Sequence, residues 1–408
     1  MAAFGCYFCM YGFRRPFTAA TYLDTPVADF KTVLVTSQVL GYMLAKFVGI
    51  KIVAEMPPER RAIALLAQIL AAEATLVLFA LIPPPWNAAC LFLNGLSLGM
   101  VFGLVLGFLE GRRVTEMLVA GLCASFILAD GVTKSVGAWL LAQGVTELWM
   151  PAVAGLLFLA PLVLFVAMLA RVPAPGAADV AARAPREAMT RAERWAFVRR
   201  HAPGLLPLVL MYLGVTIVRS IRADFAPEIW RELGTEAVPG TFTRSELWVA
   251  LGVLVLNGSA ILITDSRRAF FVSLATCGLG FGLLVAALAA LRAEALSSFA
   301  FMVLLGFGLY LPYVAVHTTV FERLLAVTRD RGNLGFLMYF ADSIGYLGYV
   351  VVMVISRFGI APAGVLKLLL GAGWVVAGVS VLCLVQSASY FARAGARRAP
   401  AIAVEEVG

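Results

Sequence analysis

The sequence has very little charge for its length. Only 14% of its 408 residues are Asp, Glu, Lys or Arg, whereas 62% are hydrophobic, and the mean hydropathy is +0.92. A soluble globular domain carries about 25% charged residues, so this composition excludes that class. It predicts a protein whose chain crosses a lipid bilayer many times.

The sequence also lacks the motifs of an enzyme. It contains two histidines, His201 and His317, and it has no metal-ligand spacing, no phosphate-binding glycine loop and no nucleophile elbow. We therefore expect no catalytic residue, no metal site and no cofactor. A membrane enzyme or a lipid-handling protein is an alternative from another class, and no motif supports it.

Six cysteines are present, and all of them lie in apolar stretches, at positions 6, 9, 90, 123, 277 and 383. A disulfide framework is therefore not expected. Cys6 and Cys9 form a C-x-x-C pair, which would suggest redox or metal chemistry in a soluble protein. Without a second pair, packing within a membrane helix is the better interpretation.

Apolar runs of about 20 residues predict twelve membrane-spanning helices in two sets of six. They lie near 1–22, 31–54, 61–83, 87–110, 115–142, 148–171, 204–229, 245–265, 269–291, 297–321, 333–357 and 362–391. Residues 172–203 are polar, proline-containing and basic, which predicts a linker that ends in a short amphipathic helix at the membrane surface.

The predicted fold is therefore an all-α membrane protein made of two six-helix bundles. We expect an N-terminal bundle at 1–171, a cytoplasmic linker at 172–203, a C-terminal bundle at 204–391 and a cytoplasmic tail at 392–408. No charged segment precedes the first apolar run, so a retained first helix is expected and not a signal peptide. The chain begins almost inside that helix, which leaves a start further upstream open.

The arginines between the spans predict the orientation. They gather on one side of the predicted membrane, at 60–61, 112–113, 183–200, 267–268, 323–331 and 397–398. The opposite loops hold mostly acidic residues, such as Asp24, Asp29 and Glu232. By the positive-inside rule the arginine-rich side is cytoplasmic and carries both termini, as in a multi-pass protein of the inner (plasma) membrane. The net charge of +8 is thus a topology signal and does not indicate a nucleic-acid partner.

Two arginines, Arg14 and Arg219, lie inside apolar stretches, and each opens one half of the sequence. A charge in the middle of a membrane helix costs at least about 2.5 kcal/mol, so it normally faces a cavity, a partner or a substrate. One arginine in each half predicts an anion site between the two bundles. A purely structural salt bridge is the alternative for both residues.

The two halves also resemble each other. Glu110 closes the fourth predicted span and Glu322 closes the tenth, and in each half an Ala-Asp dipeptide follows twenty residues later, ending at Asp130 and Asp342. Such internal similarity is typical of transporters built from two related bundles, which hold their substrate near the membrane midplane between them.

Twelve spans with a long basic central loop resemble the major facilitator superfamily. Three segments resemble its organophosphate:phosphate antiporter branch, which includes glycerol-3-phosphate transporters. Residues 7–17 (YFCMYGFRRPF) resemble that branch's Y-x3-Y-x2-R-[KR]-x-F, residues 42–47 (YMLAKF) its Y-x-x-S-K-F, and residues 219–227 (RSIRADFAP) its R-x4-D-W-x-P. The sequence also resembles an uncharacterised bacterial family of facilitator-like membrane proteins.

The resemblance implies a phosphate site. Arg14 and Arg219 correspond to the two arginines that grip phosphate, with Lys46, Tyr7, Tyr11 and Tyr42 around them. A guanidinium group can meet phosphate oxygens in bidentate fashion, which agrees with that assignment. Tyr310 and Tyr313 flank Pro312 in the tenth span, where a gating bend or a stacking surface would be useful. Monomer is the superfamily default.

The sequence departs from the family pattern in two places. Residues 49–55 lack the Asp-Arg pair that usually follows the second span and latches the cytoplasmic helix ends, so the latch is built differently or is absent. The fifth span offers Ser125, Asp130 and Lys134 where the antiporter branch carries a histidine.

Several other charged residues have two interpretations. Asp130 and Lys134 are four residues apart, so a local ion pair competes with a functional role. Asp342 has no such neighbour and either pairs with an arginine or takes up a proton, whereas His317 is more readily a packed polar residue than a proton relay. We expect Arg15 and Arg222 to snorkel or to pair with Asp224. For Glu73 we expect a structural hydrogen bond.

The sequence therefore predicts a secondary transporter that moves a small anionic, phosphorylated metabolite by alternating access. Exchange for inorganic phosphate, or co-transport of a proton on Asp342, would reset the cycle. A non-transporting membrane sensor of such a ligand and a proton-coupled carrier of another organic anion, such as a carboxylate, are the alternatives.

Overall fold

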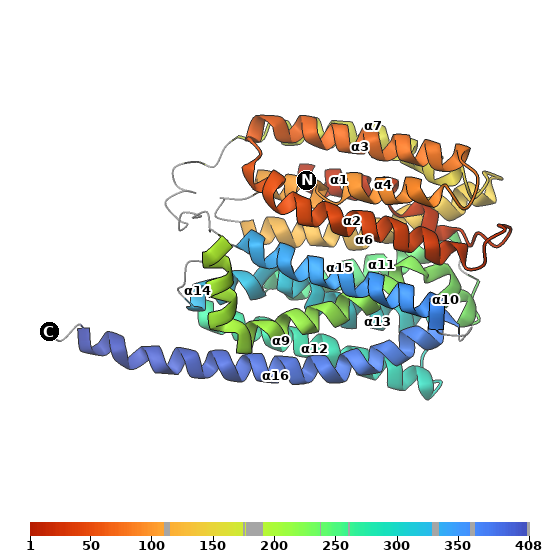
Figure 1. Ribbon diagram of the computed structural model, residues 1–408. Helices are drawn as coiled ribbons and strands as arrows, with labels where there is room; N and C mark the ends of the chain where they lie inside the picture. The colour runs from red at the N-terminus through yellow and green to blue at the C-terminus, as the bar shows by residue number, and fades with distance from the viewer. Residues whose placement is uncertain are drawn as a thin grey trace.

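The computed structural model describes residues 1–109, 115–173, 176, 191–236, 238–259, 262–328, 334–359 and 364–405. Over these residues the regular structure is helical (Figure 1). Arginine-rich segments that helped to predict the orientation, at 112–113, 183–190 and 329–331, lie outside the described residues, as does Glu110.

The first half of the chain forms one bundle. Its elements are α1 (Ala2–Met10), the 3-10 turns η1 (Tyr11–Phe13) and η2 (Pro16–Ala19), α2 (Phe30–Glu55), α3 (Pro58–Leu81), α4 (Ala88–Leu98), α5 (Val101–Leu109), α6 (Thr115–Ala142) and α7 (Met150–Ala170). The helix α1 stops at Met10, although we predicted a span over 1–22. Pro16 cannot donate a backbone hydrogen bond, which disfavours a continuous helix through this segment.

The second half forms the other bundle. Its elements are α9 (Arg191–Asp224), α10 (Ala226–Glu232), α11 (Pro239–Ser259), α12 (Ser266–Arg292), α13 (Ser298–Ala315), the π-helical segment η4 (Val316–Val320), α14 (Phe321–Thr328), α15 (Leu334–Gly359) and α16 (Val365–Glu405). The predicted amphipathic segment and seventh span are one continuous helix, α9, which contains Pro203 and Pro207. Figure 1 shows the first turns of α9 crossing the end of the bundle before the helix bends into it.

Ten helical segments in the described part of the chain are long and apolar enough to cross a membrane. The first and the eighth predicted spans are not among the ten. The first is only a short apolar helix, Ala2–Phe13. The eighth is α11, whose first half carries Arg244 and Glu246 and is therefore less hydrophobic. The protein is thus a multi-span membrane protein, as its composition predicts.

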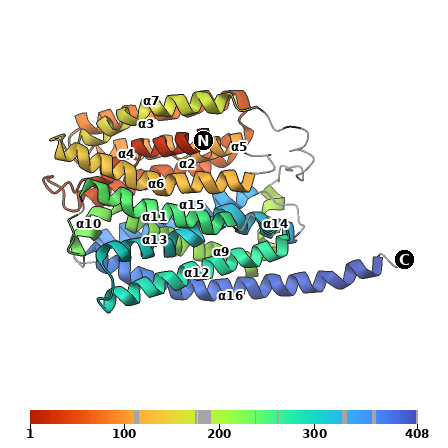
Figure 2. The same cartoon turned by 180° about the vertical axis from the view of Figure 1, so that it is seen from behind.

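The two bundles lie side by side, as Figures 1 and 2 show from opposite sides. They meet along two pairs of helices, α2 against α15 and α6 against α11. In both views the C-terminal end of α16 extends beyond the bundles at the end where the chain passes from α7 to α9.

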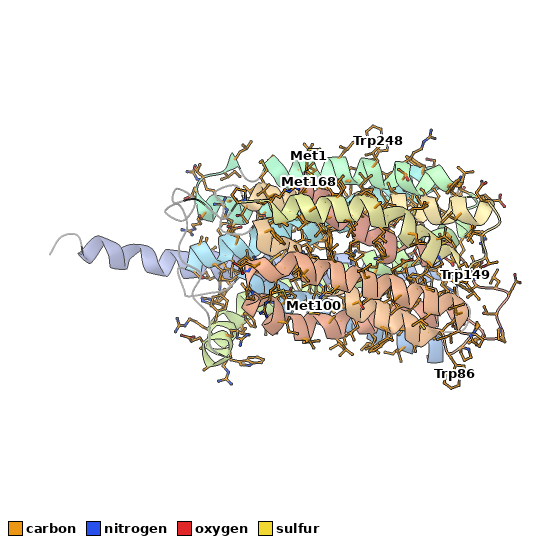
Figure 3. The ribbon with its side chains drawn as sticks, turned by 90° about the horizontal axis from the view of Figure 1, so that it is seen from above. Met1, Trp86, Met100, Trp149, Met168 and Trp248 are labelled. Atoms are coloured by element: carbon orange, nitrogen blue, oxygen red, sulfur yellow. The ribbon has the colours of Figure 1, made fainter. Side chains whose placement is uncertain are left out.

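The outer surface of the bundles is apolar. Trp86 and Trp248 are 76% and 60% exposed, and exposed leucine and valine side chains cover much of the rest. Figure 3 shows Trp86 and Trp149 near the end of the molecule that lies opposite the C-terminal tail. Tryptophan at such a position is typical of a membrane interface. The polar residues that could serve a function therefore lie mostly inside.

Candidate functional site

Among the residues that the structure describes, seven lysine and arginine side chains are buried inside the helical bundles. They are Arg14, Arg15, Lys31, Lys46, Lys134, Arg219 and Arg222. Five of the seven have a carboxylate partner, and two have none among the described residues. This division separates the structural charges from those available to a ligand.

One group of paired charges joins the two bundles around Arg15. Its Nε lies 3.0 Å from Asp130 Oδ1, and its guanidinium also pairs with Asp224 of α9. Lys134 pairs with Asp130, as one of the two sequence interpretations expected, and the Tyr349 hydroxyl donates to Asp224 at 2.8 Å. We call these residues the Arg15 network. Asp224 is thus a partner of Arg15, as predicted.

Two further ion pairs flank the Arg15 network. Arg222 Nη2 lies 2.8 Å from Glu246 Oε1 and donates to the Met302 carbonyl at 3.0 Å. Lys31 Nζ lies 2.6 Å from Glu228 Oε1 and therefore joins α2 to α10 of the other bundle. Arg222 consequently pairs with Glu246, and not with Asp224 as the sequence suggested.

A second link between the bundles surrounds Asp342 of α15. Lys46 of α2 pairs with its carboxylate, the Tyr212 hydroxyl donates to it, and His317 Nε2 lies 3.3 Å from Oδ1. We call these four residues the Asp342 cluster. Asp342 was expected to pair with an arginine or to take up a proton; its partner is a lysine that is 296 residues away in sequence.

Arg14 and Arg219 have no carboxylate partner among the described residues, although each is only 2% exposed. Arg14 Cζ lies 3.8 Å from the ring centre of Tyr42, and Arg219 Cζ lies 4.3 Å from that of Tyr313. These contacts are cation–π interactions. The Nε of each arginine is buried without a hydrogen-bond partner in the described part of the chain.

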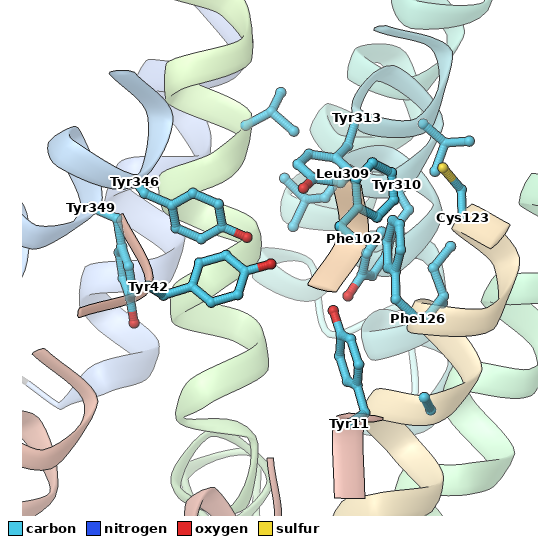
Figure 4. Close-up of a cluster of buried hydrophobic side chains, with 14 of the residues drawn as sticks. Tyr11, Tyr42, Phe102, Cys123, Phe126, Leu309, Tyr310, Tyr313, Tyr346 and Tyr349 are labelled. Atoms are coloured by element: carbon cyan, nitrogen blue, oxygen red, sulfur yellow. The ribbon is translucent and has the colours of Figure 1, made fainter. Parts of the chain in front are cut away.

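Tyrosine rings from both bundles surround the two arginines. In Figure 4 the hydroxyl groups of Tyr42 and Tyr346 point from α2 and α15 toward the side where Tyr11, Tyr310 and Tyr313 lie. The Tyr42 and Tyr346 ring centres are 5.2 Å apart. Arg14 lies on the ring of Tyr42, which contacts Tyr346 of the other bundle, and Arg219 lies on the ring of Tyr313, so both guanidinium groups are held by this set of tyrosines.

Packed aromatic side chains line one side of the region that holds Arg14 and Arg219. Tyr7 packs edge-on against Phe102, with ring centres 5.4 Å apart, and Phe126 packs against Tyr313 at 5.8 Å. The structure thus brings together all of the predicted tyrosines with Arg14 and Arg219. Sequence reasoning missed Tyr346, which lies one helical turn after Asp342 and could have been found from that spacing.

The position of Arg14 depends on two buried amides. Asn94 Nδ2 donates to the carbonyls of Phe13 and Ala72, each at 3.2 Å, and Gln38 Nε2 donates to the Arg14 carbonyl at 3.0 Å. Gln38 also donates to Asn94 Oδ1 at 2.9 Å. Inside a membrane, carbonyls released by a broken helix must find donors within the protein. The two amides therefore stabilise the break that turns Arg14 toward the centre.

Close packing of α2 on α4 brings these amides together. A Cβ atom on Gly95 would lie 1.9 Å from the Gln38 carbonyl oxygen, and one on Gly41 would lie 2.0 Å from that of Phe92. Only glycine allows the two backbones to approach this closely. A polar side chain in an apolar span was the signal that could have singled out Gln38 and Asn94.

One prediction about a charged residue is wrong. Glu73 of α3 was expected to make a structural hydrogen bond, but both of its carboxyl oxygens are buried without a partner among the described residues. The nearby amide of Asn94 is directed to the carbonyls of Phe13 and Ala72 and does not reach the Glu73 carboxyl group.

The fold is similar to that of two transporters of known structure. A D-xylose-proton symporter matches with a TM-score of 0.59 and 14% identity over 94% of this chain and 95% of the symporter. The human organic anion transporter MFSD10 (TETRAN) matches with a TM-score of 0.58 and 16% identity over 95% of this chain and 97% of that protein. At these identities the similarity concerns the fold, and it confirms the predicted major facilitator fold.

No curated protein matches the sequence. A family model matches residues 16–394, which is nearly the whole chain, and the family it describes is of unknown function. The chain therefore belongs to the DUF5690 family and has the major facilitator fold.

Proposed function

We propose that this protein is a secondary transporter of a small anionic, phosphorylated metabolite, which it carries across the inner membrane with both termini in the cytoplasm. The observation that carries the proposal is a pair of buried guanidinium groups, Arg14 in one bundle and Arg219 in the other, for which the described residues supply no carboxylate. Buried charges are normally paired or bound to a ligand.

The balance of the buried charges supports a dianion. Arg15, Lys134 and Arg222 are matched by three carboxylates, and Lys46 is matched by Asp342. The two remaining arginines leave two positive charges near the membrane midplane. A phosphate monoester carries about −1.5 to −2 charges at neutral pH, and each guanidinium can bind two of its oxygens.

The paired charges on either side of the arginines suggest how access alternates. The Arg15 network and the Asp342 cluster each connect the bundles, through Arg15–Asp224 and Lys46–Asp342. Binding of an anion by Arg14 and Arg219 draws the bundles together, and opening toward one side requires one of these links to separate. Lys46, which we predicted as a third phosphate ligand, becomes available only when it leaves Asp342.

Two resetting steps fit this arrangement. In the first, the transported metabolite is exchanged for inorganic phosphate, which occupies Arg14 and Arg219 while the carrier returns to its starting orientation. Alternatively, a proton on Asp342 would break the Lys46–Asp342 link, with His317 next to the carboxylate as the group through which the proton passes. Asp130 and Lys134 would act in the Arg15 network on the other side of the arginines.

Transport in proteoliposomes tests the proposal. Vesicles loaded with inorganic phosphate are given labelled phosphate or a labelled phosphorylated, carboxylated or neutral metabolite. We expect uptake of phosphorylated compounds by the wild-type protein and none by Arg219→Ala, with folding and insertion intact. Binding without uptake would identify a membrane sensor, and uptake of carboxylates alone would identify a carrier of another organic anion. Normal uptake by Arg219→Ala would place the site elsewhere.

A further inference from the structure

Within the described part of the chain, five acidic side chains are buried inside the bundles, and four of them have a cationic partner. Asp130 and Asp224 pair with Arg15, Glu246 pairs with Arg222, and Asp342 pairs with Lys46. The fifth is Glu73 of α3, which is 7% exposed. Neither of its oxygens has a hydrogen-bond donor among the described residues.

The carboxyl group of Glu73 lies in a notch between α3 and α7. A Cβ atom on Gly155 of α7 would be 2.1 Å from Glu73 Oε2 and 3.1 Å from the Phe13 ring, so only a glycine leaves room for the carboxyl group. Ala72, the residue before Glu73, accepts a hydrogen bond from Asn94. Glu73 therefore lies beside the segment that positions Arg14.

The elements that pack mainly against α3 offer Glu73 no counter-charge among the described residues. The helix α3 packs mainly against α4, α5, α7 and η1. None of the four contains a charged residue, and their only titratable groups are the Cys90 thiol of α4 and the Tyr11 hydroxyl of η1. The nearby amide of Asn94 is engaged by carbonyl groups and by Gln38.

An ionised carboxylate in this position would be expensive. Removing an ion from water without a partner costs several kcal/mol even after the protein relaxes, whereas burial of a neutral polar group without a hydrogen bond costs about 1–3 kcal/mol. The four paired carboxylates escape this penalty through their cations. Glu73 has no such cation, and it avoids the desolvation penalty only when its carboxyl group is protonated.

We propose that Glu73 is a proton-binding site in the N-terminal bundle and that it is occupied in the arrangement described. Release of the proton requires water or a cation to reach the notch, so it requires α7 and η1 to move away from α3. Because η1 leads into Arg14, proton release at Glu73 would accompany a displacement of that arginine. The proposal does not depend on the identity of the anion.

Infrared spectroscopy of the purified full-length protein in lipid tests the proposal. At pH 7 an exposed glutamate, whose pKa is about 4.3, is ionised and shows no band of a protonated carboxyl group. We expect the wild-type protein to show such a band and Glu73→Gln to lose the part of it that comes from Glu73. Glu59→Gln, the same change at an exposed position of the same helix, should keep the band.

The absence of the band in the wild type, or a band of unchanged intensity in Glu73→Gln, would overturn the proposal. Thermal unfolding gives a second measurement. Glutamine has the shape of a neutral glutamic acid, so Glu73→Gln should change the unfolding temperature by less than about 2 °C. A larger loss of stability would mean that Glu73 is ionised and partnered, which also contradicts the proposal.

Discussion

Arg14 and Arg15 are neighbours in sequence and are equally buried, yet their surroundings are opposite. Arg15 contacts two carboxylates, Asp130 and Asp224, whereas Arg14 lies on the ring of Tyr42 without any carboxylate among the described residues. Consecutive residues at a break in a helix point in different directions, so one enters the ion-pair network and the other faces the centre.

The second bundle repeats the contrast. Arg222 pairs with Glu246, while Arg219, three residues earlier on α9, lies on the ring of Tyr313. Each bundle therefore supplies one arginine that holds the structure and one whose charge is unmet. Aromatic faces attract a guanidinium without neutralising it, and this leaves the two central arginines able to bind an anion.

Removal of a paired arginine should have the largest effect. Arg222→Ala leaves Glu246 buried without its cation, which costs about 3–5 kcal/mol of stability. Arg219→Ala leaves no described carboxylate without its cation, so it should reduce the stability much less. Thermal unfolding of the two purified variants makes the comparison. Equal losses of stability would show that Arg219 contributes as much to the stability of the fold as Arg222 does.

Removal of an unpaired arginine should affect the ligand and not the fold. Arg14→Ala should weaken binding of a phosphorylated ligand by about 1.5–3 kcal/mol, the value of hydrogen bonds to a charged group. Arg14→Lys should recover only part of the affinity, because an ammonium group cannot form the bidentate contact. Titration calorimetry measures both variants, and unchanged affinity would remove Arg14 from the site.

The link between Lys46 and Asp342 should show a smaller, coupled effect. Tyr212 and His317 also contact Asp342, so they offset part of the loss when Lys46 is replaced. A double-mutant cycle with Lys46→Met and Asp342→Asn should give a coupling energy of about 1–3 kcal/mol. Additive effects would mean that the ion pair does not hold the bundles together.

The amides that position Arg14 should have the smallest effect. Asn94→Leu keeps the size of the side chain but leaves the Phe13 carbonyl without its donor. We expect ligand affinity to fall about fivefold, which corresponds to about 1 kcal/mol. Ser97→Ala, at a half-buried position of the same helix, is the control. Equal affinity in both variants would mean that Asn94 does not position the arginine.

The fold could be predicted from the sequence because membrane spans are long apolar runs that are recognisable one at a time. The break after Met10 and the continuous helix α9 depend on what surrounds those segments. Pro16 disfavours a continuous first span without locating the break, and no residue pattern indicates that α9 is continuous. The Asp130–Lys134 pair was foreseeable, since residues four apart lie on one helix face.

The rest of the site depends on contacts between distant segments. Lys46 meets Asp342 only because α2 packs against α15, and Tyr346 joins the site for the same reason. Likewise, Glu73 has no cationic partner among the described residues because α4, α5 and α7, which pack against α3, contain no charged residue. Sequence patterns identify which residues are unusual in a membrane helix, whereas tertiary packing decides which of them are neutralised.

The central claim is that Arg14 and Arg219 bind an anion between the bundles. Its most direct test is a thermal-shift screen of the purified protein in detergent against matched phosphorylated, carboxylated and neutral metabolites, since a specific ligand stabilises the folded state by mass action. We predict that phosphorylated compounds raise the unfolding temperature of the wild type and not that of Arg219→Ala. No shift with any phosphorylated compound, or a shift that survives the substitution, would contradict the claim.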